Sequence, residues 1–320
     1  IQSGQLVGFP TETVYGLGAD ALQAAAVARI FAAKGRPADN PLIAHVCSLE
    51  MAEPLADFTP LAARLAERYW PGPLTLVLPR RPLVPDIVSA GLPTVALRFP
   101  SHAIAKALIE TAATPIAAPS ANLSGRPSPT LAAHVYEDMA DKIPLILDGG
   151  LVQIGLESTV VDARGRYPIL LRPGQISAEE LAELAGDCLY PTAGSAERPA
   201  APGMKYRHYA PAASMVVVEG ETASVAEAIK YLYDKDLKKG EKPLVMAARE
   251  HKRLYGRRDV AVTGTIEDLR GVAKSLYALL RDADAAGYTS ILFEAVPKEG
   301  IGFAVMNRVY KAAAYNIVRV

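Results

Sequence analysis

The stretch Phe9-Pro-Thr-Glu-Thr-Val-Tyr-Gly-Leu-Gly18 directly follows the first apolar segment of the chain, Gln5–Phe9. This apolar segment predicts a strand that ends at a proline. Two threonines flank the carboxylate of Glu12, and two glycines allow the backbone to turn sharply. These residues alone leave two interpretations open: a strand-to-helix turn with a threonine cap, or a ligand site built from hydroxyl groups and a carboxylate.

Strand-like and helix-like segments alternate from here to about residue 186, which predicts an α/β domain. The many prolines in this part favour an open, twisted, mixed sheet with long shaped loops over an ordinary parallel sheet. We expect strands at Gln5–Phe9, Leu42–Val46, Leu74–Leu78, Thr94–Arg98, Ile116–Ala118, Leu145–Leu147 and Ser158–Asp162. We expect helices at Leu22–Lys34, Leu61–Tyr69, His102–Ala112, Leu131–Ala140 and Ala178–Ala185.

The distribution of proline divides the chain near residue 212. Of 25 prolines, 23 lie at or before Pro211, and only Pro243 and Pro297 follow. We therefore expect a catalytic domain over residues 1–186, a linker over residues 187–213 and a smaller C-terminal domain over residues 214–320.

The C-terminal part has a regular strand–helix pattern that predicts a doubly wound, Rossmann-like α/β domain. It has no Gly-x-Gly-x-x-Gly after its first strand, so this fold does not imply a dinucleotide. The expected strands are Met215–Val218, Leu244–Ala247, Val260–Val262 and Ser290–Phe293, and the expected helices are Ser224–Tyr233, Ile266–Asp284 and Phe303–Tyr315.

The linker has a spacer-like composition, but it contains Lys205, Tyr206, Arg207, His208 and Tyr209 in succession. Two interpretations stay open for it. It is either an inert tether or a segment that closes over a site, because long ordered loops often act as lids.

The overall charge of the chain excludes a general electrostatic attraction to nucleic acid or membrane. The 34 basic residues balance 34 acidic ones, and the first 212 residues carry 17 basic and 20 acidic groups. No apolar run approaches the ~20 residues that span a bilayer, so we expect no membrane partner. The two cysteines, Cys47 and Cys188, favour a reducing, cytoplasmic setting and cannot form a metal cluster by themselves.

A rigid pair of cations follows the first predicted helix. Lys34 and Arg36 are interleaved with Gly35 and Pro37, and such a pair suits polyphosphate, because Lys supplies a point charge and Arg a bidentate fork. The alternative is that they only complement the dipole at a helix C-terminus. Asn40 is either a cap or a ligand contact, and His45, inside an apolar strand, is most simply a core histidine.

Uncharged and cationic groups also gather where other strands end. The loop after Pro115–Ala118 contains Ser120, Asn122, Ser124, Ser128 and Thr130, which form either an anion cradle or a Ser/Pro-rich surface loop. Arg98 and Arg172 each end a strand-like run, where open α/β sheets collect their ligand-binding groups. Together these strand ends favour a cleft that binds polyphosphate.

The ordered segments resemble the Sua5/YrdC/YwlC family, the threonylcarbamoyl-AMP synthases. The resemblance is carried, over about residues 4–186, by Pro10-Thr-Glu-Thr-Val-Tyr-Gly-Leu, Lys34-x-Arg36-Pro, Asn40-Pro-Leu, Pro119-Ser-Ala-Asn-x-Ser-Gly125, Glu157-Ser-Thr-Val160 and Arg172-Pro-Gly. Pro202-Gly-Met-x-Tyr-Arg-His-Tyr-Ala-Pro211 and the ending after Gly300 are similar to the longer, two-domain Sua5 form. The resemblance implies a YrdC-like domain with a concave cleft, followed by a C-terminal Sua5 domain.

The resemblance also implies a nucleotidyltransferase reaction. L-threonine, bicarbonate and ATP, with Mg2+ accompanying the ATP, would give threonylcarbamoyl-AMP and pyrophosphate. The product would pass to a separate transferase complex for the t6A modification of tRNA, so the chain itself need not contact tRNA.

Each candidate residue then has an implied role. The catalytic candidates are Lys34, Arg36, Ser120 and Asn122. The ATP-binding candidates are Lys34, Arg36, Asn40, Thr94, Ser120, Ser128, Arg172, His208 and Tyr209. The L-threonine-binding candidates are Thr13, His45, Arg98, Ala118 (through its backbone) and Ser158, and no residue is expected to bind a metal directly.

Two other readings fit the sequence less well. An RNA-binding module would need aromatic residues interleaved with basic ones, which the acidic N-terminal part lacks. A carbamoyl-transfer domain like those of hydrogenase-maturation proteins would be accompanied by zinc-finger cysteines, and two scattered cysteines do not supply them.

Overall fold

In the computed structural model the stretch 9–18 forms a β-hairpin. β1 (Val7–Pro10) pairs antiparallel with β2 (Tyr15–Asp20), with Phe9 opposite Gly16. Thr11 closes the connecting loop, because its hydroxyl donates to the carbonyl of Val14 at 2.7 Å and accepts from the amide of Thr13. Of the two interpretations, the strand-to-helix turn with a threonine cap is therefore wrong. β2 is buried along its whole length, so it lacks the alternation of apolar and polar residues by which a strand is recognised.

The structure describes residues 1–191 and 209–320, and the chain divides into two units. One unit comprises residues 1–124 and 128–206, and the other comprises residues 125–127 and 207–320.

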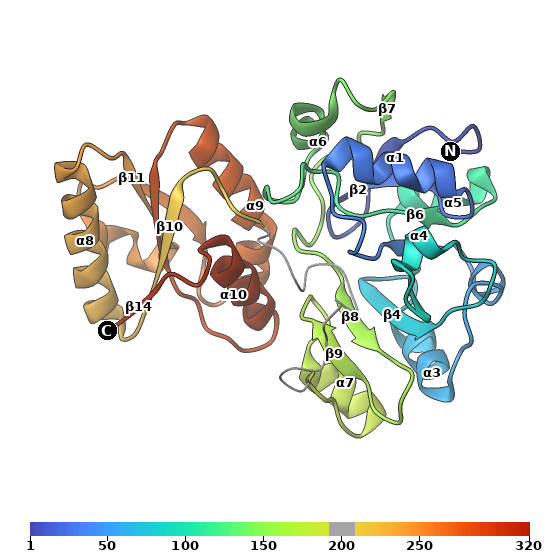
Figure 1. Ribbon diagram of the computed structural model, residues 1–320. Coiled ribbons are helices and arrows are strands. Elements are labelled where there is room, and N and C mark those ends of the chain that lie inside the picture. The colour runs from blue at the N-terminus through green and yellow to red at the C-terminus, as the bar shows by residue number, and fades with distance from the viewer. Residues whose placement is uncertain (192–208) are drawn as a thin grey trace. The chain divides into compact units, whose positions relative to one another are not determined.

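The first unit is built on a mixed nine-stranded sheet with the order β7-β1-β2-β6-β3-β5-β4-β8-β9 (Figure 1). Besides β1 and β2, its strands are β3 (Ile43–His45), β4 (Leu74–Pro79), β5 (Thr94–Arg98), β6 (Ile116–Ala117), β7 (Leu145–Ile146), β8 (Thr159–Asp162) and β9 (Ile169–Arg172). Its helices are α1 (Ala24–Lys34), α2 (Leu49–Ala52), α3 (Pro60–Tyr69), α4 (Asp86–Ser89), α5 (Ala103–Ala112), α6 (Ala132–Met139) and α7 (Ala178–Ala185). Every strand and helix predicted in this part is present, and the mixed sheet is confirmed.

The main core of this unit packs helices against the sheet. Ile30 of α1, Leu65 of α3 and Leu97 of β5 are fully buried in it. A smaller apolar cluster, formed by Ile43, Val77, Ala96, Val160 and Leu171, contains residues from β3, β4, β5, β8 and β9.

The second unit is a doubly wound domain, as predicted. Its parallel sheet has the order β12-β11-β13-β10-β14. In Figure 1, α8 covers one face of this sheet, and α9 and α10 pack together on the other. The elements are β10 (Ser214–Glu219), α8 (Thr222–Lys238), β11 (Pro243–Ala248), η1 (Arg249–Tyr255), β12 (Val260–Gly264), α9 (Leu269–Ala285), β13 (Ser290–Glu294), α10 (Ile301–Ala312) and β14 (Ile317–Arg319). The 3-10 helix η1 and the edge strand β14 were not predicted.

Across the described segments, the structure contains no helix that is both long enough and apolar enough to cross a membrane.

We predict that Gly18→Ala destabilises the first unit. A Cβ at residue 18 would lie 2.8 Å from both the Phe9 ring and the Ile116 side chain, so the core would have to shift. We expect the free energy of unfolding to fall by ~1–3 kcal/mol in urea denaturation, as for other overpacked cores. The control is Gly165→Ala, where the nearest atom would be 3.7 Å away. Equal stability of the two variants would contradict this account of the hairpin glycines.

Candidate functional site

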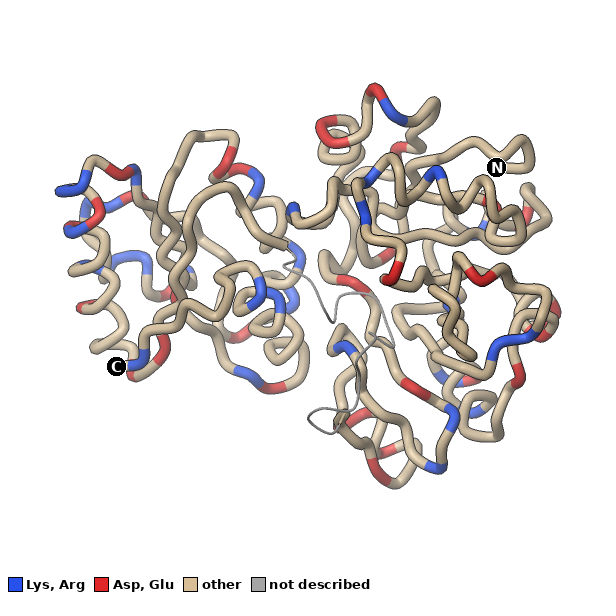
Figure 2. Tube along the Cα trace, in the orientation of Figure 1, with Lys and Arg blue, Asp and Glu red and all other residues tan. Residues whose placement is uncertain are grey.

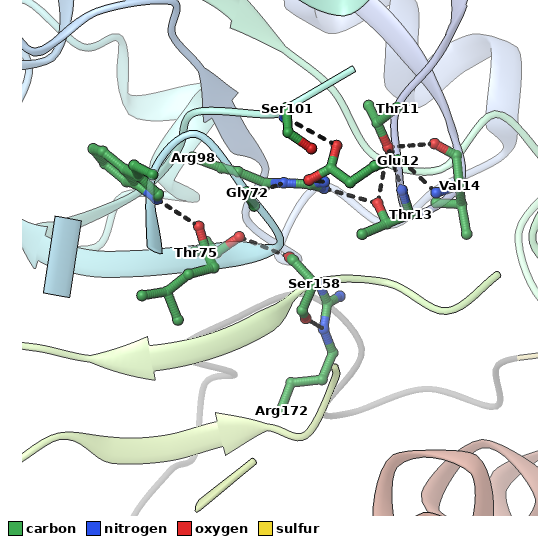
Figure 3. Close-up of polar contacts among 12 residues, drawn as sticks. Thr11, Glu12, Thr13, Val14, Gly72, Thr75, Arg98, Ser101, Ser158 and Arg172 are labelled. Atoms are coloured by element: carbon green, nitrogen blue, oxygen red, sulfur yellow. Dashed lines mark hydrogen bonds and ion pairs between the residues drawn. The ribbon is translucent and has the colours of Figure 1, made fainter. Parts of the chain in front are cut away.

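Arg98, the last residue of β5, is buried beside the β1–β2 hairpin. Its guanidinium group donates to the Glu12 carboxylate at 2.7 Å and to the Thr13 hydroxyl at 2.9 Å (Figure 3). The second oxygen of Glu12 accepts from the amide of Ser101 at 3.3 Å. The Arg98 and Glu12 side chains are only 4% and 2% exposed, so the ion pair is almost completely shielded from water. The hairpin and the end of β5 therefore fix one guanidinium group in a preset orientation.

His45 lies next to Arg98, because β3 and β5 pair in parallel with these residues in register. Burial lowers the pKa of His45 to about 3, and the positive charge of Arg98 adds to this effect. The ring packs edge-on against Phe9, and its Nδ1 lies 3.2 Å from the carbonyl of Ile43. His45 is therefore neutral at physiological pH, and Arg98 is the nearby cation.

Ser158 connects the strands on the other side of Arg98. Thr75 of β4 is in register with Arg98, and its hydroxyl lies 2.7 Å from that of Ser158. Arg172, at the end of β9, donates to both the carbonyl and the hydroxyl of Ser158 at 3.1 Å. Figure 3 shows two neighbouring sets of polar contacts, one around Arg98 with Glu12 and Thr13, and the other joining Thr75, Ser158 and Arg172. Arg172, which was predicted on the ATP side, thus contacts a predicted threonine-side residue.

Ala118 also lies close to this group. It follows β6, and its amide donates to the carbonyl of Ile43, two residues before His45, at 3.0 Å. The structure therefore brings all five predicted threonine-side residues to neighbouring strands or to the hairpin beside them.

Thr94 begins the strand that Arg98 ends. Residues two and four positions apart in a strand share a face, so Thr94, Ala96 and Arg98 point the same way. A rise of ~3.3 Å per residue separates the first from the last by ~13 Å. The apolar cluster that includes Ala96 lies between the two polar ends.

Lys34, the last residue of α1, holds the loop that follows Ala118. Its buried ammonium group donates to the carbonyl of Ser120 at 2.5 Å and to that of Asn122. The Ser120 hydroxyl donates to the Asn122 side chain, and the amide of Ser124 donates to the carbonyl of Lys34. The prediction treated Lys34 as a direct phosphate ligand, whereas its described contacts fix the Ser120–Asn122 loop and place a positive charge beneath it.

Arg36 organises the segment that leads into β3. Its guanidinium group donates to the carbonyls of Asn40 and Pro41 at 3.3 and 3.1 Å. The Asn40 side chain is 1% exposed, and its Oδ1 has no hydrogen-bond partner within the described segments. A buried acceptor without a hydrogen-bond partner costs free energy. The Asn40 Oδ1 is therefore suited to accept a hydrogen bond from a bound ligand.

Ser128 contacts the segment that contains Ser158. Its hydroxyl donates to the Glu157 carboxylate at 2.6 Å, and both residues are buried. Ser128 is thereby tied to the residue that directly precedes Ser158.

The two linker candidates are placed differently. His208 lies outside the residues that the structure describes, as does most of the segment from Lys205 to Tyr209. Tyr209 belongs to the second unit, where its ring stacks on Tyr277 at a centroid distance of 5.4 Å and lies under the guanidinium of Arg308.

Three residues that were not among the candidates hold candidate side chains of the first unit in place. Glu12 pairs with Arg98, Thr75 positions Ser158, and Glu157 holds Ser128. A signal for the first two was visible in the sequence, because Glu12 lies inside the threonine-rich motif and Thr75 is the only polar residue between Leu74 and Leu78. Glu157 directly precedes Ser158 in the motif Glu157-Ser-Thr-Val160.

No group of three or more His, Cys, Asp or Glu side chains in residues 1–191 and 209–320 is placed to hold a metal ion.

Comparisons with known proteins cover both units. The Sua5_yciO_yrdC family model, described as "Telomere recombination", matches residues 1–174. A second model, described as "Threonylcarbamoyl-AMP synthase, C-terminal domain", matches residues 176–314.

Individual relatives match over the whole chain. The threonylcarbamoyl-AMP synthase of Pyrococcus abyssi is 50% identical over 100% of this chain and 94% of its own length, and that of Bacillus subtilis is 43% identical over 100% and 92%. The crystal structure of P. abyssi Sua5 complexed with L-threonine matches with a TM-score of 0.94 at 49% identity, over 100% of this chain and 94% of that one.

These matches confirm the predicted family and fold class. The chain belongs to the Sua5/YciO/YrdC family, in its two-domain form with a threonylcarbamoyl-AMP synthase C-terminal domain.

Proposed function

We propose that this chain is a threonylcarbamoyl-AMP synthase, a nucleotidyltransferase that joins L-threonine, bicarbonate and the AMP part of ATP and releases pyrophosphate. The observation that carries the proposal is the full-length similarity to relatives of that name, together with the match to a Sua5 structure that contains L-threonine.

Arg98 is the residue best suited to bind the threonine carboxylate. A guanidinium group has five N–H donors in a fixed fork, and Glu12 and Thr13 hold that fork in one orientation. A carboxylate that adds to this fork gains charge-assisted hydrogen bonds in a site with little water, where such bonds are strong. Because His45 is neutral, it adds no second charge and can exchange a hydrogen bond with an uncharged substrate group.

The chemistry then needs a bond to the α-phosphorus of ATP. The threonine amine adds to CO2 and loses a proton, or condenses with bicarbonate and releases water, to form a carbamate. A carbamate oxygen then attacks the α-phosphorus. The bond between this phosphorus and the bridging oxygen breaks, and pyrophosphate leaves with the electron pair. Negative charge spreads over the phosphate oxygens, so preorganised cations and N–H donors in the site would lower the barrier most.

We place the ATP near the Ser120–Asn122 loop. Lys34 fixes this loop and supplies positive charge beneath it, and Arg36 orders the approach to β3. The orphan Oδ1 of Asn40 is an acceptor that would suit a donor group of the nucleotide. Mg2+ would enter as part of the substrate, bound to the phosphates of ATP, which supply the hard oxygen ligands it prefers.

The product is an activated acyl-adenylate that must be passed on. We assign its transfer onto tRNA adenosine to a separate t6A transferase complex, as expected for the family. Acidic and basic residues are interspersed along both units (Figure 2), and the balanced total charge agrees with a role that does not require tRNA contact.

The proposal is tested by pyrophosphate release from ATP. We expect release by the full chain to require both L-threonine and bicarbonate, and to be much slower with serine and other amino acids. Release that does not depend on threonine would overturn the proposal.

Arg98→Ala should raise the KM for threonine far more than the KM for ATP. The reason is that the variant removes the proposed carboxylate partner and leaves the Ser120–Asn122 loop in place. The control is Arg81→Ala, which removes an exposed ion pair with Asp57. Equal increases in both KM values would remove the assignment of Arg98.

Glu12→Gln should lower both stability and the use of threonine. It leaves the buried Arg98 charge without a counter-charge, and breaking a buried ion pair in this way costs roughly 3–5 kcal/mol. We expect this loss in urea denaturation, together with a lower kcat/KM for threonine and a nearly unchanged KM for ATP. Asp57→Asn, at the exposed pair, should cost less than ~1 kcal/mol. A variant as stable as the parent would contradict the proposed importance of this pair.

His45 should make stability depend on pH below neutrality. Its pKa is about 3 in the folded chain and ~6.5 when unfolded, so between these values the unfolded state binds the extra proton. The stability contribution is therefore fully present above pH ~6.5 and is lost as the pH falls, by up to ~1.4 kcal/mol per pH unit. We would measure the free energy of unfolding by urea denaturation at several pH values from 7.5 to 5. This free energy should fall less steeply with decreasing pH for His45→Gln than for the parent. Identical slopes would show that His45 is not held neutral.

A further inference from the structure

The second unit contains a cavity of about 530 Å3 that the synthase chemistry does not use. It is lined by the carboxyl ends of β10, β11 and β13 and by the segments that follow them. A cavity of this size is in the range that holds a small organic ligand.

The position of the cavity in the sheet is the first argument. β13 and β10 are neighbours, but their following helices leave in opposite directions: α8 leads from β10 to β11, and α10 leads from β13 to β14. Figure 1 shows these two helices on opposite faces of the sheet. Open α/β sheets bind their ligands at the carboxyl edge beside such a switch in direction.

The second argument is a pair of carboxylates held at this edge. Glu294, at the end of β13, shares a hydrogen bond with His251 and accepts another from the Tyr255 hydroxyl at 3.0 Å. The Glu294 side chain is only 7% exposed. Burying polar groups in this way costs free energy, and apolar residues of the same shape would stabilise a fold equally well. A buried hydrogen-bond network beside a cavity is therefore better explained by a ligand than by stability.

Glu219, at the end of β10, belongs to a second network on the same cavity. It accepts from the Tyr310 hydroxyl and lies 3.2 Å from Lys298 Nζ and 3.4 Å from Arg319 Nε. Burial alone would raise the pKa of Glu219, but the hydrogen bonds from Tyr310 and Lys298 outweigh this and lower it. Glu219 is thus an anion, and Lys298 is a cation on the wall of the same cavity.

The cavity therefore offers two kinds of contact. Carboxylate oxygens at two strand ends can accept hydrogen bonds from ligand hydroxyl groups. Lys298 and His251 can donate hydrogen bonds to a ligand anion. The seventeen-residue helix α8 adds to them, because it begins at Thr222 on the cavity wall and the side chain of its N-cap residue, Glu221, makes no capping hydrogen bond.

We propose that the second unit binds a phosphate monoester that carries hydroxyl groups, either a nucleoside monophosphate or a sugar phosphate. The anion would lie near Lys298 and the start of α8, and the hydroxyls near Glu219 and Glu294. The strand end Val218-Glu-Gly-Glu-Thr222 lacks the three spaced glycines that let a backbone approach a pyrophosphate, which favours a single phosphate over a dinucleotide.

Hydrogen exchange of the full chain, followed by mass spectrometry, tests this locally. We expect millimolar AMP or ribose 5-phosphate to slow amide exchange in residues 218–225 and 294–303. Protection by AMP alone would identify a nucleotide, and equal protection by both would identify a sugar phosphate. Adenosine, which has no phosphate, should protect at least about tenfold less well. No protection by either phosphate, or equal protection by adenosine, would overturn the proposal.

Thr222→Asp supplies the decisive variant. A carboxylate in the first turn of α8 suits the helix dipole, so the fold should be kept, but it competes with the ligand anion for the same N–H groups. We expect an affinity about tenfold weaker, whereas the matched Thr222→Asn variant, of the same shape without the charge, should bind like the parent. Equal binding by the two variants would show that no anion lies there. Because the readout is exchange in the second unit, its outcome is independent of the pyrophosphate-release assay.

Discussion

The buried ion pair between Arg98 and Glu12 is the constraint on which the first unit depends. A guanidinium group with 4% exposure cannot be left without a counter-charge, so the hairpin that supplies Glu12 must lie against the end of β5. This requirement joins residues 86 positions apart in sequence. It also explains why a motif with two threonines and a glutamate occupies a hairpin loop: each polar group there either closes the loop or holds the arginine.

Uncharged polar side chains lie around this ion pair. His45 is kept uncharged by burial and by the neighbouring arginine, while Thr75 and Ser158 exchange a hydrogen bond between hydroxyls. Lys34 places another buried cation beneath a loop of small polar residues. The first unit thus holds Arg98 beside the hairpin, Arg172 on Ser158, and Lys34 beneath the Ser120–Asn122 loop.

Much of this arrangement could be predicted from the sequence, but not all of it. β5, with its short apolar run between Thr94 and Arg98, and α3, with its helical period, were found because each has an apolar pattern of its own. β2 was missed because it is buried on both faces and rich in glycine, and β14 because a three-residue edge strand has too few residues for a pattern. Glu12 was seen but not assigned, since its role depends on Arg98, which lies far away in sequence. Likewise, nothing local in the sequence shows that the ammonium group of Lys34 reaches backbone carbonyls in a distant loop.

The short strand β5 has one more implication. It has five residues, from Thr94 to Arg98. Because five is an odd number, the first and the last side chain lie on the same face of the sheet. Inserting or deleting a single residue inside it would turn one of these side chains to the opposite face of the sheet. The length of β5 is therefore fixed both by the distance between its two polar ends and by the need for an odd number of residues.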